Sequence, residues 1–151
     1  MGLIDDLKNA IDNYETDNCR TEIVDFTMSS GQSVLNVNEG FMFRIKVTNQ
    51  SHLDMRSVKV RAIGTSYADV GLFPPMSGYS SYVISGAFNL DAHQSYTTGY
   101  FSGKAKAVTN GVKDIVTARI ESWDANLEHI LIDHTGAGAA EGKLSKDIQP
   151  D

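Results

Sequence analysis

The strictest pattern in the chain is the alternation of apolar and polar side chains over residues 41–49. Phe43, Ile45 and Val47 would share one side of an extended strand, because successive side chains of a strand point to opposite faces. A period of two does not fit a helix and indicates a strand with one buried and one hydrated face. Segments of the same character recur, so the chain is predicted to be all-β.

The predicted strands lie between clusters of turn residues. They cover residues 21–28, 33–37, 41–49, 57–65, 94–101, 105–109, 112–122 and 127–134, and the irregular stretch 64–87 is expected to add one or two short edge strands, such as 79–85. About seven or eight short strands with hardly a helix between them are typical of an Ig-like antiparallel β-sandwich with Greek-key connections. An open or closed barrel is the alternative.

The alternation also predicts which side chains form the core and how some strands connect. The expected core residues are Phe43, Ile45, Val47, Val58, Val60, Val116, Ala118 and Ile120. Asn110-Gly111 is the strongest hairpin signal, because a type I′ turn needs positive φ at both positions, and it predicts that 105–109 pairs with 112–122. A second turn is expected at 124–126.

Both ends of the chain differ from the middle. Leu3, Ile4, Leu7, Ile11 and Tyr14 recur at helical spacing, so residues 3–14 are predicted to form a short amphipathic helix. Such a helix needs its apolar stripe buried, against the sandwich, a copy of itself or a partner. We divide the chain into a helix and linker (1–18), a β-sandwich domain (19–135) and a flexible or docking tail (136–151).

The composition limits the classes of partner. A chain of 151 residues, 41% hydrophobic, is long enough for one core without disulfides or metal. The formal net charge of -6 and the scattered Lys and Arg argue against nucleic acid. The single Cys19 excludes an intramolecular disulfide. No apolar run is long enough for a membrane span. Acidic residues near the start interrupt the apolar run that a signal peptide needs. We expect a cytoplasmic protein by default, with a surface or assembly-exported location left open.

Three segments together resemble the bacterial cell-adhesion-related (CARDB-type) Ig-like modules. They are residues 37–49, residues 57–62, and Leu90-Asp91-Ala92 ahead of the strand at Ser95-Tyr96-Thr97. This chain departs from the pattern at Ser51 and His93, where that group usually carries glycine. The resemblance implies a sandwich used in adhesion, spacing or display, and it brings no catalytic residues.

No constellation of residues reaches the specificity of a catalytic or cofactor motif. Asp124, Glu128, His129, Asp133 and His134 are the densest set of ligand-type residues, but alternation along a strand divides them between two faces. No serine lies in the Gly-x-Ser-x-Gly pattern of a nucleophile elbow. The Gly-rich segment 136–142 lacks the Gly-Lys-Ser/Thr ending of a phosphate loop. We therefore expect no enzyme, no cofactor and no metal site, and an enzyme or metal-binding protein is kept only as the last alternative.

The remaining functional signal is the irregular excursion over residues 64–87. It combines Tyr67, Tyr79 and Tyr82 with glycine, serine and proline, a composition found in adaptable recognition loops. We expect a structural or interaction module that belongs to a homomeric or multi-component assembly, with Leu3, Ile4, Leu7, Ile11 and these tyrosines as contact candidates. A glycan- or peptide-binding module using the excursion is the alternative.

Overall fold

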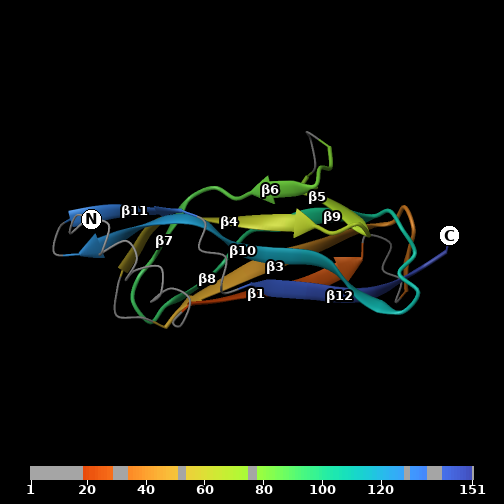
Figure 1. Cartoon of the computed structure of the whole chain (residues 1–151), viewed down its shortest axis with the longest axis horizontal. Helices are drawn as coiled ribbons and strands as arrows, with labels where there is room; N and C mark the ends of the chain where they lie inside the picture. Colours follow the sequence, from red (N-terminus) through yellow and green to blue (C-terminus); the bar gives the residue numbers. More distant parts are fainter. Residues whose placement is uncertain are drawn as a thin grey trace, which may run out of the picture.

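The chain folds as an Ig-like β-sandwich, with two sheets packed face to face and most strands running along the long axis of the molecule (Figure 1). The computed structural model describes residues 19–28, 34–50, 54–74, 78–127, 130–135 and 141–150, with the backbone alone at 125–127 and 130–135. Strands, turns and loops make up these residues. The predicted helix at 3–14 lies outside them. No helix that could cross a membrane occurs in the described part of the chain.

The first sheet is antiparallel and centres on the strictly alternating strand. Its strand order is β1-β3-β9-β5, and β8 also pairs with β3. The bounds are β1 Cys19–Met28, β3 Gly40–Asn49, β5 Ala68–Leu72, β8 Ser95–Thr97 and β9 Phe101–Ala105.

The second sheet centres on the longest strand, β10. Its order is β2-β12-β10-β4-β6, while β11 also pairs with β10 and β7 with β4. The bounds are β2 Leu35–Asn36, β4 Asp54–Gly64, β6 Tyr82–Ile84, β7 Phe88–Leu90, β10 Val112–Leu127, β11 Ile130–Thr135 and β12 Gly142–Gln149. Among the described strands, only β2 and β12 pair in parallel.

The core lies between the two sheets and contains every residue predicted for it. The eight expected core side chains are all buried, each at most 2% exposed. Phe43 stacks on Phe101 with ring centroids 5.6 Å apart. Phe41 packs on Gly103, its direct partner in the β3–β9 ladder, where any Cβ would overlap the ring. The alternation therefore identified the inward face of these strands correctly.

Main-chain hydrogen bonds join the two sheets at one lateral side. Val70 of β5 and Ser80, just ahead of β6, exchange hydrogen bonds of 2.8 and 2.7 Å. β5 is the edge of the first sheet and β6 the edge of the second, so the excursion 64–87 links both edges. The one or two short edge strands predicted in the excursion, such as 79–85, are confirmed as β6 and β5.

The predicted hairpin at Asn110-Gly111 is wrong in its pairing. Both residues have positive φ, 56° and 114°, as expected. However, the strand before them, β9, pairs with β3 and β5, whereas β10 pairs with β4, β11 and β12. The turn therefore carries the chain from the first sheet to the second. The prediction was wrong because local turn geometry does not decide which strands pair.

Three further boundaries differ from the prediction. The expected turn at 124–126 lies inside β10, which continues to Leu127. The expected strand at 94–101 divides into β8 and the start of β9. Residues 142–149, assigned to a tail, form β12, where Leu144 and Ile148 are buried. With only these two apolar side chains, β12 gains its order from pairing with β10 and β2, which sequence periodicity does not reveal.

Candidate functional site

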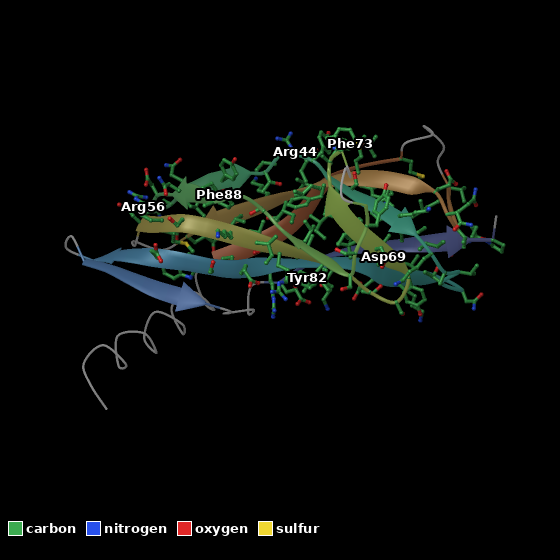
Figure 2. All side chains as sticks on the ribbon, turned by 90° about the horizontal axis from the view of Figure 1, so that it is seen from above. Arg44, Arg56, Asp69, Phe73, Tyr82 and Phe88 are labelled. Carbon is green, nitrogen blue, oxygen red and sulfur yellow. The ribbon has the colours of Figure 1, made fainter. Side chains whose placement is uncertain are left out.

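The three tyrosines of the excursion do not form one surface. Tyr67 is partly buried against the core, whereas Tyr79 and Tyr82 are 38% and 49% exposed. The Tyr82 ring lies under the guanidinium of Arg61, 4.5 Å from it, and Arg61 also pairs with Glu121 at 2.7 Å. This makes Tyr82 part of an ion-pair and ring cluster on the outer face of the second sheet (Figure 2). Leu3, Ile4, Leu7 and Ile11 lie outside the described residues, so their contact role stays a prediction.

The structure instead gathers exposed apolar side chains around a hollow that we call the lateral groove. The lateral groove holds about 210 Å³ and lies between the edges of the two sheets, on the side of β5 and β7. Its lining comes from strands β5, β7, β8 and β9 and from the β6–β7 and β8–β9 connections. The lining residues are Leu72, residues 85–88, Tyr96 and residues 98–101.

Aromatic contacts shape both walls of the lateral groove. Phe88 of β7 stacks on Tyr96 of β8 with ring centroids 4.2 Å apart, and this contact joins the two sheets. The rings of Tyr100 and Phe73 are T-shaped, with centroids 6.5 Å apart, and the guanidinium of Arg44 lies over the Tyr100 ring, 5.3 Å from its centroid. Arg44 and Phe73 accordingly lie next to each other in Figure 2. Leu72, Tyr96 and Tyr100 remain 51%, 40% and 39% exposed.

The groove lies beside two interruptions, one between β6 and β7 in the second sheet and one between β8 and β9 in the first. In the second sheet Ser85 lies between β6 and β7. Its Oγ accepts a hydrogen bond of 3.0 Å from the N–H of Val60, which ties the interruption to β4. In the first sheet Thr98 follows β8 and accepts the N–H of Ile45 through Oγ1 at 3.1 Å. The carbonyl of Thr98 accepts from Arg44 Nε at 2.8 Å. These hydrogen bonds hold the interruptions in defined positions, which makes the groove a formed feature of the fold.

The described lining of the groove offers apolar surface and hydroxyl groups. Its described lining residues carry aromatic rings, aliphatic side chains and the hydroxyls of serine, threonine and tyrosine, without a carboxylate, imidazole, thiol or amine. Such a surface can bury apolar groups and exchange hydrogen bonds with main chain or hydroxyls.

The other candidate residues do not converge in the described part of the chain. Of the ligand-type set, Asp124 lies opposite Asp133 in the β10–β11 ladder, but the side chains from 125 to 140 are outside the description. Among the described residues no three His, Cys, Asp or Glu side chains are grouped to hold a metal ion. Cys19 is buried, with its Sγ 3.7 Å from Met55 Sδ.

Sequence reasoning missed Tyr96, Tyr100 and Phe88 as site residues. Tyr96 and Tyr100 fall in the expected strand 94–101 and look like ordinary strand side chains, and Phe88 lies between expected strands although the structure places it in β7. The available signal was the weak alternation of residues 94–101, which marks the interruption between β8 and β9. The approach of β7 and β5 to the β8–β9 segment depends on long-range strand pairing, which the sequence pattern does not show.

Comparison with solved structures finds CARDB domains, in agreement with the resemblance seen in the sequence. The crystal structure of a CARDB domain from Pyrococcus furiosus, in complex with di-metal ions, has a TM-score of 0.44 and 11% identity over 87% of each chain. The solution structure of that domain has a TM-score of 0.45 and 14% identity, covering 87% of this chain and 94% of the other. The C-terminal domain of wzt has a TM-score of 0.42 and 10% identity, covering 87% and 74%. A scan against protein-family models finds no match, and a search of curated proteins finds no significant match.

Proposed function

We propose that this chain is a non-enzymatic interaction module that binds its partner in the lateral groove. The observation that carries the proposal is the exposure of Leu72, Tyr96 and Tyr100 around one formed hollow. Exposed apolar side chains gathered on a soluble surface mark interaction sites more often than chance. Tyrosine is also a preferred contact residue, since its rigid ring buries a large area and keeps a polar end.

The size of the groove supports part of a larger ligand as the occupant. Its volume of about 210 Å³ is below the roughly 300–1,000 Å³ of sites that enclose a small molecule. It suits one or two side chains of a protein, or one sugar ring of a glycan. The chemistry of the lining favours binding over catalysis.

A second copy of the chain is one protein that could occupy the groove, in keeping with an assembly subunit. Phe73, 52% exposed beside Tyr100, would enlarge the contact area beyond the hollow. Self-association through this surface would depend on concentration, whereas binding of a foreign partner would leave the isolated chain monomeric.

The experiment compares Tyr100→Ala with Tyr79→Ala, two tyrosines of nearly equal exposure of which only Tyr100 lines the groove. Both variants and the wild type are probed with a random dodecapeptide phage library and a glycan array, and their masses are measured by light scattering over a range of concentrations. We expect Tyr100→Ala to weaken binding or self-association at least tenfold and Tyr79→Ala to leave it unchanged. Equal behaviour of the two variants in every assay would overturn the groove as the binding site.

A further inference from the structure

The first sheet has an open edge where it borders the lateral groove. β8 pairs with β3 on one side, and no described strand pairs with its other side. The neighbouring strand β5 covers β9 only as far as the Leu72↔Phe101 pair. Pro74, two residues on, lacks an N–H and cannot extend this ladder along β8.

The register of β8 shows which main-chain groups face the open side. Asn49 N–H donates to Gln94 O at 2.8 Å, and Thr98 N–H donates to Ile45 O at 2.9 Å. In an antiparallel ladder such hydrogen-bonded pairs alternate with pairs whose main-chain groups point away from the partner strand. Ser95 and Thr97 occupy these alternate positions, so their N–H and C=O groups point away from β3.

We propose that the occupant of the lateral groove is an extended peptide that adds to the β8 edge as a further strand. This inference rests on the proposed function and names its ligand class. Strand addition takes its affinity from main-chain hydrogen bonds and its specificity from alternate side chains. Here Ser95 and Thr97 supply the hydrogen-bonding groups.

The surroundings of the edge define the side chains that such a peptide carries. Tyr96 pairs with the buried Val47, so its ring lies on the inward face together with Phe88. Inward side chains of an added strand would enter the hollow beside these rings, which favours an apolar residue there. Every second side chain of the peptide would face outward.

The outer face beside the edge carries more basic than acidic side chains. Lys46 is the register partner of Thr97 on β8 and of Glu22 on β1, and the ion pair of Glu22 is with Arg20, at 3.0 Å. Arg44 lies against Tyr100 and Thr98, and its only ion pair among the described residues is to Asp25, at 3.7 Å. Acidic outward residues on the peptide would complement these charges. The expected ligand is therefore an extended segment that alternates apolar and acidic side chains.

The test uses peptides selected from the random dodecapeptide library on the full chain, resynthesised with a native backbone and with N-methyl groups at alternate residues. The matched protein variant is Thr97→Pro, which removes an outward N–H without removing a hydrogen bond to β3. Each lost main-chain hydrogen bond should weaken binding by up to about tenfold. We expect one of the two N-methylation patterns and Thr97→Pro each to weaken binding to that extent, and the selected sequences to alternate apolar and acidic residues.

The outcomes separate this inference from the proposed function. If Tyr100→Ala abolishes peptide binding while N-methylation and Thr97→Pro leave it intact, the groove binds but strand addition is wrong. If the library yields no peptide and the glycan array yields a Tyr100-dependent ligand, strand addition is likewise wrong and the binding site stands. If neither source yields a Tyr100-dependent ligand, strand addition is overturned, and the proposed groove function then rests on self-association alone. Should Thr97→Pro fail to fold, the N-methylated peptides decide the question on the wild-type chain.

Discussion

The contact between Phe41 and Gly103 provides the sharpest test of the core packing. The two residues are direct partners in the β3–β9 ladder, and the Phe41 ring covers the glycine. A Cβ on Gly103 would lie 2.8 Å from Phe41 Cε1 and closer still to Cζ and Cε2, whereas ordinary contact begins at 3.4 Å. Gly103→Ala therefore forces the ring to move.

The ring has little room to move. Phe41 is 1% exposed and lies between Phe26, at 5.6 Å, and Phe43, at 6.1 Å between ring centroids. Forcing a group into a close-packed core costs about 1–3 kcal/mol. Replacing glycine by alanine restores about 0.4–1 kcal/mol through the unfolded state. The free energy of unfolding should therefore fall by up to about 2.5 kcal/mol.

Urea denaturation measures this change, with Gly99→Ala as the matched control. A Cβ at Gly99 meets nothing within 4 Å, so this variant should be as stable as the wild type or slightly more stable. Adding Phe41→Leu to Gly103→Ala should recover part of the loss, and a double-mutant cycle would show the coupling. If Gly103→Ala proves as stable as Gly99→Ala, the described packing of Phe41 on Gly103 is incorrect.

Three further predictions concern stability, each measured by reversible unfolding. Phe43→Ala, which empties a fully buried ring site, should lower the free energy of unfolding by about 3–5 kcal/mol, and a loss under about 1 kcal/mol would contradict the core assignment. Asn49→Asp should cost about 1–3 kcal/mol, because the buried amide donates to the carbonyls of Leu90 and Asp91 at 3.3 Å each and a carboxylate cannot. Gly111→Ala should cost about 1–2 kcal/mol, since alanine disfavours φ of 114°; an unchanged melting temperature would contradict this turn geometry.

Local alternation was sufficient to determine the fold class and the inward side chains. Phe43, Ile45 and Val47 had to share a face once the segment was extended, because the period of a strand is two regardless of its partners. Positive φ at Asn110 and Gly111 was likewise a local property. Each of these features depends on residues close together in the chain, so the printed sequence already contained them.

Tertiary structure alone decided which strands pair and where the groove forms. Asn110-Gly111 joins strands of different sheets, and β12 is ordered although it carries only two buried apolar side chains, because long-range partners supply the hydrogen bonds and the burial. The lateral groove brings Leu72, Phe88 and Tyr96 together from three strands in two sheets. Such convergence depends on the register and the ends of distant strands, and these arise from the packing of the whole chain.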